Sequence, residues 1–274
     1  MIQGTSSGAG KTTLVAALCR IFSNSGMRVC PFKSQNMSNF SYKNKDFEIS
    51  RAQAIQAIGA KCEITPDLNP ILLKPCGNYY STVFIHGKRF KKMHATDYYK
   101  KFVKTKGLKV VMDSLWRLKQ KYDVIIIEGA GSPAEINLQK FDIANMKIAE
   151  KINSPVLLIS DIDRGGSFAS IVGTLALLDS RHQKLVKGFV INKFRGDINI
   201  LKPGFTKLKQ LTKRPVFGAI PMMKINLPEE DSLGVKPKPI TFNKKNIDKI
   251  DREIDKLSKH VKKNLNIKAI ERLM

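Results

Sequence analysis

A run of nine small and polar residues near the start of the chain has the composition of a loop that binds phosphate. It reads GTSSGAGKT, from Gly4 to Thr12. Small residues let backbone N–H groups surround phosphate oxygens, and a helix that begins here adds the partial positive charge of its N-terminus. Lys11 would reach the outer phosphates, and the Thr12 hydroxyl would bind Mg²⁺. We expect the nucleotide to be held by Gly4, Thr5, Ser6, Ser7, Gly8, Ala9, Gly10, Lys11, Thr12 and Thr13.

The spacing of this loop departs from the usual phosphate-loop pattern by one residue, because five residues instead of four separate Gly4 from Gly10. Its context supports the prediction, since an amphipathic helix follows over residues 11–25 and Gly26 is its stop signal. Only residues 1–3 precede the loop. The first strand is therefore short, and the sequence leaves open whether the true start lies upstream of Met1. Because the loop begins at Gly4, the sequence has no room for a signal peptide.

Two strand ends carry carboxylates that could serve the same site. Glu128 ends a buried strand in IIIEGAGSPAEINL, and a buried carboxylate is costly unless it meets a cation. It is a candidate Mg²⁺ ligand, with a helix-capping carboxylate as the alternative. DIDRGGSF follows the next strand and places Asp161, Asp163 and Arg164 at the carboxyl edge of the sheet, where doubly wound folds bind ligands. A salt-bridged turn is the alternative there.

Three further polar positions are candidates for the site. Asn192, in NKFRGD, has an amide that can donate to adenine and accept from it at once. Lys33, in PFKSQNMS, would be a second lysine for a reaction in which a carboxylate attacks ATP, because the negative charge of both partners must be neutralised. A surface lysine is the alternative. A helix over residues 48–57 opens with Glu48, and its polar residues either face a site or cap and solvate the helix.

The elements that would position these residues alternate between strands and helices. Near-continuous apolar runs predict strands buried on both faces, at residues 124–128, 156–160, 188–192 and 216–220. A further strand is expected at residues 28–32, after the first helix. We expect an α/β fold of the P-loop NTPase type, with a doubly wound, mostly parallel sheet and helices on both faces. Residues 77–109 carry nine basic residues and indicate either an excursion over the substrate or a solvated helix face. A linker over 235–245 and an amphipathic helix over 246–274 follow a domain at 1–234.

The formal net charge of +25 is extreme for 274 residues. It could attract nucleic acid, steer ATP and a polyanionic small substrate, or reflect only a lysine-rich proteome. The basic residues are spread along the chain without an arginine-rich arm, so we expect no nucleic-acid partner. No segment approaches the roughly 20 apolar residues of a membrane helix. The four cysteines lack metal-binding spacing and indicate reduced thiols of a cytoplasmic protein.

The collinear order of these motifs resembles the synthetase part of cobyric acid synthases. The set covers residues 1–234 and runs GTSSGAGKT, PFKSQNMS, EISRAQAIQA, LNPILLKP, IHGK, EGAGSPAEINL, DIANM, DIDRGGSFAS, VINKFRGD and LPEEDSLG. EGAGSPAEINL and DIDRGG together distinguish this family from cobyrinic acid a,c-diamide synthase and dethiobiotin synthetase, although the loop spacing is that of the dethiobiotin synthetase branch.

The resemblance implies an ATP-dependent amidation of the b, d, e and g carboxylates of adenosylcobyrinic acid a,c-diamide through acyl phosphates. It implies that Lys11 and Lys33 stabilise the transferring phosphoryl group, that Thr12, Glu128 and Glu48 hold Mg²⁺, and that Asn192 reads adenine. It places Asp161, Asp163 and Arg164 at the corrinoid or phosphoryl end. A homodimer is compatible with it.

One departure from the family concerns nitrogen. The family also carries a glutaminase domain with a Cys–His–Glu triad on a nucleophile elbow. None of Cys19, Cys30, Cys62 and Cys76 has that setting, so we expect this domain to be absent and ammonia to come from solvent or from a separate domain or subunit. Two other functions compete with this one. They are another ligase of the dethiobiotin synthetase type and a ParA- or MinD-like ATPase switch, although the latter proteins place an additional lysine where this chain has Thr5, Ser6 and Ser7.

Overall fold

The computed structural model describes residues 1–228 and 240–274. The chain divides into two compact units, each built from more than one segment. The first unit comprises residues 1–14, 128–224 and 257–274, and the second comprises 15–127 and 225–256. The family motif LPEEDSLG from residue 229 on and the first part of the predicted linker, 235–239, lie outside the described residues.

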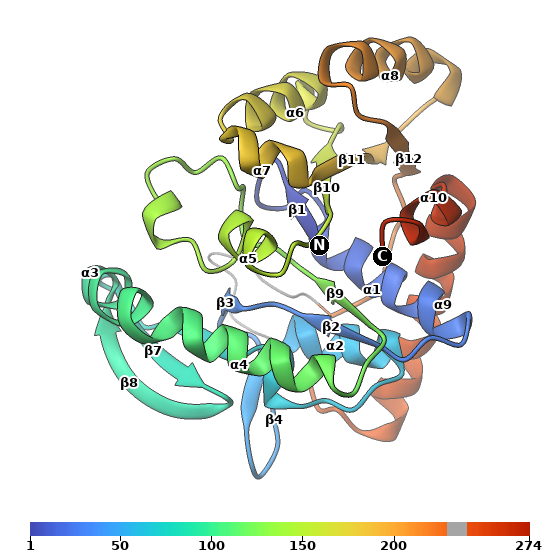
Figure 1. Ribbon diagram of the computed structural model, residues 1–274. Coiled ribbons are helices and arrows are strands. Elements are labelled where there is room, and N and C mark those ends of the chain that lie inside the picture. Colours follow the sequence, from blue (N-terminus) through green and yellow to red (C-terminus); the bar gives the residue numbers. More distant parts are fainter. Residues whose placement is uncertain (229–239) are drawn as a thin grey trace. The chain divides into compact units, whose positions relative to one another are not determined.

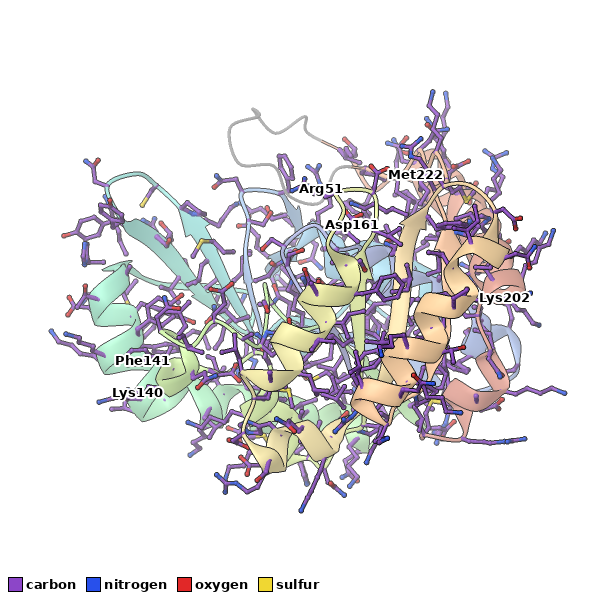
Figure 2. All side chains as sticks on the ribbon, turned by 90° about the horizontal axis from the view of Figure 1, so that it is seen from above. Arg51, Lys140, Phe141, Asp161, Lys202 and Met222 are labelled. Atoms are coloured by element: carbon purple, nitrogen blue, oxygen red, sulfur yellow. The ribbon has the colours of Figure 1, made fainter. Side chains whose placement is uncertain are left out.

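The first unit is organised around a parallel four-stranded sheet in the order β1-β10-β11-β12. Its strands are β1 (Ile2–Gly4), β10 (Val156–Asp161), β11 (Val186–Phe194) and β12 (Val216–Pro221). Because all four run the same way, their carboxyl ends meet at one edge. Asp161, the last residue of β10, and Met222, directly after β12, lie toward that edge (Figure 2).

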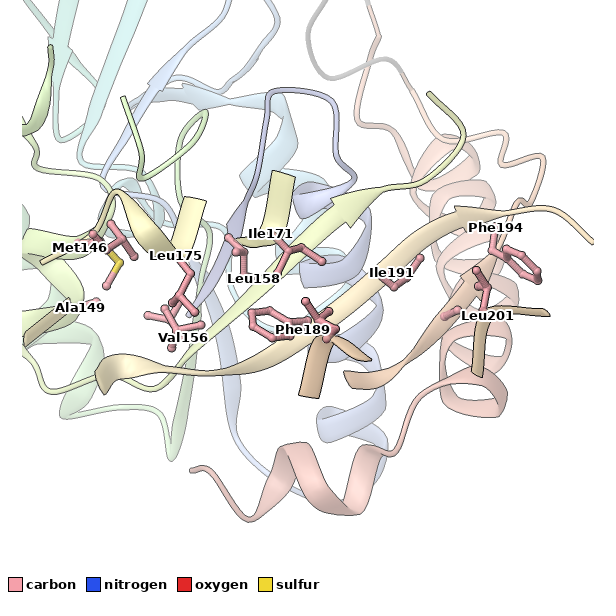
Figure 3. Packing of buried hydrophobic residues seen from close by; sticks show 14 residues of the cluster. Met146, Ala149, Val156, Leu158, Ile171, Leu175, Phe189, Ile191, Phe194 and Leu201 are labelled. Carbon is pink, nitrogen blue, oxygen red and sulfur yellow. The ribbon is translucent and has the colours of Figure 1, made fainter. Parts of the chain in front are cut away.

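A layer of helices covers this sheet. Helix α6 (Ser167–Ala176) packs on β10, α7 (Ser180–Leu185) on β11 and α8 (Ile198–Thr212) on β12, while α5 (Met146–Lys151) contacts α7 (Figure 1). A short 3₁₀ turn, η3 (Gln139–Phe141), precedes α5. The apolar side chains between the layers form one core, with Val156, Leu158, Phe189 and Ile191 at its centre (Figure 3). The strands are buried on both faces, which is why they are nearly all apolar in sequence.

Among the described residues, the second unit contains one four-stranded sheet and two two-stranded sheets. Parallel strands β2 (Val29–Phe32) and β9 (Val124–Ile127) pair with each other. A second sheet, ordered β3-β6-β7-β8, joins β3 (Gln35–Met37) in parallel to β6 (Ile71–Pro75) and then continues with the antiparallel strands β7 (Tyr80–Ile85) and β8 (Lys88–His94). Strands β4 (Ser41–Lys43) and β5 (Glu48–Ser50) form a separate hairpin.

The second unit wholly contains α2 (Arg51–Ala60), η1 (Pro66–Leu68), α3 (Ala95–Asp97), the π-helical segment η2 (Tyr98–Gly107) and α4 (Leu108–Lys119), and it includes α9 (Lys244–Asn264) up to residue 256. Helix α1 (Lys11–Asn24) begins in the first unit, and its residues from Val15 on belong to the second. The α/β class and the mostly parallel strand pairing predicted from the sequence are confirmed. Over residues 1–228 and 240–274, no helix has both the length and the apolar character needed to cross a bilayer.

The predicted helix start at Glu48 is wrong. Residues 48–50 pair with 41–43 as strand β5, and α2 begins only at Arg51. The Ser50 side chain accepts a hydrogen bond from the Ala52 N–H and caps the helix. An N-terminal serine cap satisfies a backbone donor that has no partner within the helix, so the chain enters α2 there.

The predicted helix over 246–274 is divided in two. Helix α9 (Lys244–Asn264) ends before α10 (Ile267–Glu271). Leu265 forms a bridge to Gly218, the Asn266 N–H donates to the Phe217 carbonyl, and the Asn266 side chain caps α10. Pairing with β12 takes the backbone out of the helix at these two residues. Earlier along α9, Ile250 and Ile254 pack against Ile55 of α2, so the apolar face of this helix is used within the chain.

The basic segment 77–109 is neither purely an excursion nor purely a helix. Its first part forms β7 and β8, so Lys88, Arg89, Lys91 and Lys92 are exposed on an edge strand. The remaining five basic residues lie on η2 and α4. Lysines on an edge strand discourage pairing with other chains.

Candidate functional site

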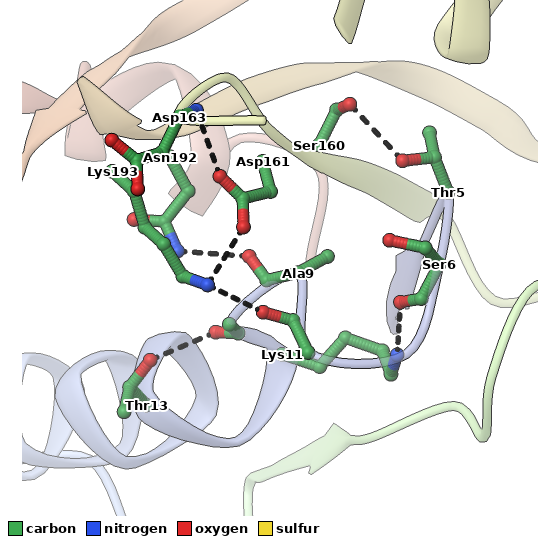
Figure 4. Close-up of polar contacts among 12 residues, drawn as sticks. Thr5, Ser6, Ala9, Lys11, Thr13, Ser160, Asp161, Asp163, Asn192 and Lys193 are labelled. Atoms are coloured by element: carbon green, nitrogen blue, oxygen red, sulfur yellow. Dashed lines mark hydrogen bonds and ion pairs between the residues drawn. The ribbon is translucent and has the colours of Figure 1, made fainter. Parts of the chain in front are cut away.

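The predicted phosphate loop, residues 4–12, joins β1 to α1 in the first unit and is tied to β10 (Figure 4). The Thr5 N–H donates to the Ile159 carbonyl at 3.0 Å, and the Thr5 hydroxyl donates to Ser160 Oγ at 3.0 Å. At the other end of the loop, Thr13 Oγ1 donates to the Gly10 carbonyl at 2.9 Å. These contacts hold both ends of the loop in place at the start of the helix.

Gly10 is required by the conformation of the loop. Its φ is +98°, in the left-handed region that favours glycine. A Cβ at this position would lie 2.0 Å from Asn192 Nδ2, well inside van der Waals contact. Gly10, the third glycine of the predicted motif, therefore lets Asn192 approach the loop backbone.

Lys11 begins α1, and its side chain turns back toward the loop. Its Nζ donates to the carbonyls of Ser6 and Gly131, each at 2.9 Å, and the residue is 7% exposed. Gly131 follows the Glu128 strand end in sequence, so one ammonium group links the two motifs that the sequence singled out. The positive charge stands where a helix N-terminus already favours anions.

Thr12 and Glu128 lie in direct contact. Thr12 Oγ1 donates to Glu128 Oε1 at 2.9 Å, and Glu128 is only 1% exposed. Ile2 of β1 forms a parallel bridge to Glu128, which places this residue beside the first strand. Hydroxyl and carboxylate oxygens are suitable protein ligands for Mg²⁺. The ion usually takes its remaining ligands from phosphate and water. Within the described parts of the chain no cluster of three or more His, Cys, Asp or Glu could hold a metal, so an ion at Thr12 and Glu128 would depend on those other ligands.

Asn192 and Lys193, at the end of β11, hold the backbone of the loop. Asn192 Nδ2 donates to the Ala9 carbonyl at 2.8 Å, and Lys193 Nζ donates to the Gly8 carbonyl at 2.8 Å. Lys193 also pairs with Asp161 Oδ2 at 2.7 Å. Lys193 was not among the predicted site residues, although it stands in the quoted motif NKFRGD. Its φ of +58°, which directs the side chain, has no signature in the sequence.

The turn after β10 contains the ion pairs that the alternative interpretation describes. The Asp163 N–H donates to Asp161 Oδ1 at 2.9 Å, Asp161 pairs with Lys193, and Asp163 accepts from Arg195 Nε at 2.8 Å. Arg164 is exposed in the same turn. Lys193 thus links Asp161 to the phosphate loop. A role for Asp163 and Arg164 in ligand binding stays a prediction.

Lys33 and Glu48 belong to the second unit, so their part in a site with Lys11 stays a prediction. Lys33 is 9% exposed, which excludes the surface-lysine alternative. Glu48 accepts from Ser41 Oγ and forms an ion pair with Lys74. Burial would raise the pKa of Glu48, but Lys74, Ser41 and Lys43 outweigh burial and lower it. A metal ion at Glu48 would therefore compete with an ammonium group.

The polar residues at the start of α2 are interior. Arg51 is 4% exposed, Gln53 is fully buried, and Asn36 Nδ2 donates to Ser50 Oγ at 2.6 Å and to Gln53 Oε1 at 3.3 Å. The Arg51 guanidinium lies 4.7 Å from the centroid of the Phe40 ring. Buried polar side chains persist when they are hydrogen-bonded. The alternative that these residues solvate the helix surface is wrong.

A loop of small residues between a parallel strand and a helix, with a lysine at the start of the helix and a threonine–carboxylate pair beside it, defines a P-loop nucleotide-binding protein. The sequence comparisons narrow this class. The family model described as the CobQ/CobB/MinD/ParA nucleotide binding domain matches residues 1–234, and the chain belongs to this family.

Curated relatives are similar over most of this chain. The "Probable cobyric acid synthase" of Thermococcus kodakarensis is 52% identical over 239 residues, which are 87% of this chain and 49% of that protein. The "Cobyric acid synthase" of Caldanaerobacter subterraneus is 50% identical over 232 residues, which are 84% of this chain and 45% of that protein. The chain thus spans about half the length of the curated relatives that it matches.

Among solved structures, the MinD cell division protein of Aquifex aeolicus is 14% identical, with a TM-score of 0.45 over 81% of this chain and 80% of that one. A likeness of this degree does not bear on function.

Proposed function

We propose that this chain is the ATP-using amidoligase part of a cobyric acid synthase. The observation that carries the proposal is the contact between Thr12 and Glu128 beside the Lys11 loop, in a chain about half identical to proteins of that name. The loop accounts for nucleotide use, and the relatives supply the substrate class. The proposed substrate is adenosylcobyrinic acid a,c-diamide, amidated at its b, d, e and g carboxylates to give cobyric acid.

The proposed reaction has two steps. A corrinoid carboxylate oxygen attacks the γ-phosphorus of ATP, and the bond from that phosphorus to the β,γ-bridging oxygen breaks, so that ADP leaves with the electron pair. Ammonia then attacks the carbonyl carbon of the acyl phosphate, inorganic phosphate leaves, and the nitrogen loses a proton. Each step moves negative charge between oxygens, so cationic groups aimed at those oxygens stabilise the transition states.

The residues around the loop suit these steps. Lys11, whose Nζ now donates to two backbone carbonyls, would exchange them for phosphate oxygens. Lys33 is proposed to stabilise the same transferring phosphoryl group. Thr12 and Glu128 would hold Mg²⁺, which neutralises phosphate charge, and Glu48 is proposed as a further ligand. One N–H of the Asn192 amide donates to the Ala9 carbonyl. The amide oxygen and the second N–H are proposed to bind adenine. Asp161, Asp163 and Arg164 are proposed for the corrinoid or phosphoryl end.

The nitrogen source provides the sharpest test. The purified chain should be incubated with ATP, Mg²⁺ and the a,c-diamide, with either an ammonium salt or glutamine, and the corrinoid products identified by mass spectrometry. We expect amidation with ammonium, faster at higher pH where free NH₃ is more abundant, and none with glutamine alone. Lys11→Ala is the inactive control. Amidation driven by glutamine alone would contradict the proposal that ammonia is the nitrogen source. ADP release without any amide product would contradict the assignment as a ligase.

A nucleotide-dependent switch is the second candidate, because the matching family model also covers MinD and ParA and because the net charge of +25 would attract DNA. The two candidates respond to different effectors. If ATPase activity rises with the a,c-diamide and is unaffected by duplex DNA, the ligase is supported. Stimulation by DNA and not by the corrinoid would favour the switch.

A further inference from the structure

The second unit contains a cavity of about 540 Å³ between the β4–β5 hairpin and the β7–β8 hairpin. This volume lies within the range of about 300–1,000 Å³ that is typical of small-molecule sites. None of the residues predicted to hold nucleotide lines this cavity, and Glu48 is the only predicted site residue in its wall. The ligand chemistry of the cavity can be inferred from its wall.

The wall is strongly cationic. Five of its fourteen residues are lysine or arginine, and two are carboxylates. Glu48 and Lys74 neutralise each other as an ion pair. Lys43, Lys45, Lys88 and Arg89 are exposed and form no ion pair within the described residues. Four cations therefore stand around one concave space, with Asp46 as the remaining anion.

The two hairpins that carry these cations are fixed to each other. Asn44 Oδ1 accepts from the N–H groups of Asp46 and Phe47 at 2.9 and 2.8 Å, which closes the first hairpin loop. The Glu48 N–H donates to the Gly87 carbonyl at 2.9 Å. Gly87 has φ +74°, and a Cβ there would lie 2.4 Å from Phe47 Cβ. The cavity is consequently built into the fold and is not a gap between loose loops.

The same backbone contacts limit the kind of anion. Phosphate sites commonly offer backbone N–H groups, arranged as a nest or at a helix N-terminus. Here the N–H groups of residues 46, 47 and 48 already donate within the protein, which leaves separate side-chain cations. Phe47 and Phe84 add half-buried aromatic surface, and the Lys74 ammonium lies 5.7 Å from the Phe84 ring centroid. Spaced cations around an apolar wall match a ligand with several carboxylates on an apolar frame.

We propose that this cavity is a binding site for an organic polycarboxylate. Its carboxylates would pair with Lys43, Lys45, Lys88 and Arg89, and its apolar frame would lie against Phe47 and Phe84. The corrinoid acid of the proposed function belongs to this ligand class, so the proposal deepens that function and rests on it for the identity of the natural ligand. Its test uses neither ATP nor a corrinoid. Failure of one proposal therefore leaves the other standing.

Cys76 provides the test, because it lines the cavity and is exposed, whereas Cys19 and Cys30 are buried. Burial also raises the pKa of Cys62 to about 12, which keeps that thiol unreactive. The labelling rate of Cys76 should be compared for the dianionic aromatic disulfide 5,5′-dithiobis(2-nitrobenzoate) and the neutral 4,4′-dithiodipyridine, relative to 2-mercaptoethanol. We expect the relative labelling rate of Cys76 to be on the order of tenfold higher for the dianionic reagent, with a smaller ratio at high salt. Benzene-1,2,4-tricarboxylate should protect Cys76.

Charge-reversal variants then identify the residues. Lys88→Glu with Arg89→Glu should abolish both the preference and the protection. Lys207→Glu with Lys209→Glu, the same change at exposed positions of α8 in the first unit, should alter neither. Circular dichroism checks that each variant is folded, and calorimetric titration of Cys76→Ser with the tricarboxylate measures binding without labelling. Absence of protection in the wild type, or equal protection by tripolyphosphate or a short DNA duplex, would overturn the proposal.

Discussion

The Thr12 hydroxyl donates a hydrogen bond of 2.9 Å to the Glu128 carboxylate, and that carboxylate is 1% exposed. A buried carboxylate is costly unless a cation or hydrogen bonds compensate it. One hydroxyl from α1 and one carboxylate after β9 thus converge where the phosphate loop ends. This convergence of two distant motifs is the basis for the metal assignment.

Glu128→Gln should reduce Mg²⁺-dependent turnover far more than ATP affinity. Glutamine keeps an oxygen that can accept from Thr12 but loses the negative charge that would hold Mg²⁺, so we expect turnover to fall about 100-fold or more. The Kd for ATP in the absence of Mg²⁺ should be nearly unchanged, as measured by calorimetry. Glu271→Gln, at an exposed position of α10, is the matched control. An unaltered Mg²⁺ dependence of the rate would mean that Glu128 only holds the structure together.

Lys11→Ala should abolish ATP-dependent chemistry and leave a folded protein. The loss of charge stabilisation in the transition state should cost several kcal/mol. Because Lys11 also donates to Ser6 and Gly131, we expect the free energy of unfolding to fall by about 1–2 kcal/mol. Urea denaturation measures this fall, and Lys207→Ala is the control. Full activity of Lys11→Ala would refute the assignment of the loop, whereas an unfolded variant would show a mainly structural lysine.

Lys193→Met tests a residue that the sequence did not single out. Lys193 Nζ donates to the Gly8 carbonyl and pairs with Asp161, so its loss should loosen the loop without removing a catalytic charge. We expect the KM for ATP to rise about tenfold, with kcat reduced less than in Lys11→Ala. Steady-state kinetics of both variants provide the comparison. Equal losses of kcat in the two would indicate that Lys193 itself contacts the transferring phosphoryl group.

The parts of the fold that the sequence predicted are those with a purely local signature. Strands such as Val156–Asp161 are buried on both faces, so they appear as apolar runs within one or two residues of their observed bounds. The β8 strand was not predicted, because KRFKKMH is a polar sequence that pairs only through its neighbour Tyr80–Ile85. The start of α2 was misplaced for a similar reason, since the pairing of Glu48 with Lys43 decides it.

The same distinction holds for the site. Lys11, Thr12 and Glu128 were found because motif spacing and strand ends are visible in sequence, and the structure brings them together. Lys193 was missed because the direction of its side chain depends on a left-handed backbone. The Glu48–Lys74 pair was missed because it joins residues on strands of two different sheets. Contacts of this kind depend on tertiary structure and leave no pattern in the sequence.

Lys74→Met should make the free energy of unfolding less dependent on pH in the acidic range. Burial raises the pKa of Glu48, but Lys74, Ser41 and Lys43 lower it below the ordinary glutamate value of 4.5. A carboxyl with a lowered folded-state pKa contributes stability above its unfolded-state pKa, and this contribution is lost as the pH falls through the folded value. Without Lys74 the folded pKa rises. The difference in unfolding free energy between wild type and variant should therefore be larger at about pH 7 than at about pH 4.

Urea denaturation at both pH values measures that difference. Lys109→Met, at an exposed position of α4, is the control and should show the same small difference at each pH. A Lys74→Met effect that is equal at pH 7 and pH 4 would mean that Glu48 does not change its protonation between them.

Arg20→Met should destabilise the protein strongly, because Arg20 fixes the first half of α9 within the second unit. Its guanidinium pairs with Asp251 and Asp255 of α9 and donates to the carbonyls of Ile58 and Gly59 of α2, with its side chain 1% exposed. The carboxylates of Asp251 and Asp255 are 41% and 43% exposed and can be solvated by water, so the main cost is that two backbone carbonyls lose their donor, about 1–3 kcal/mol each. Arg252→Met changes an exposed arginine of the same helix and should shift the unfolding free energy by less than about 0.5 kcal/mol. Urea denaturation followed by circular dichroism compares the unfolding free energies of the two variants.

Limited proteolysis should also cut Arg20→Met within residues 244–256 earlier than the wild type, because α9 would then open locally. Equal stability of the two variants would show that the apolar contact of Ile250 and Ile254 with Ile55 holds α9 without the ion pairs.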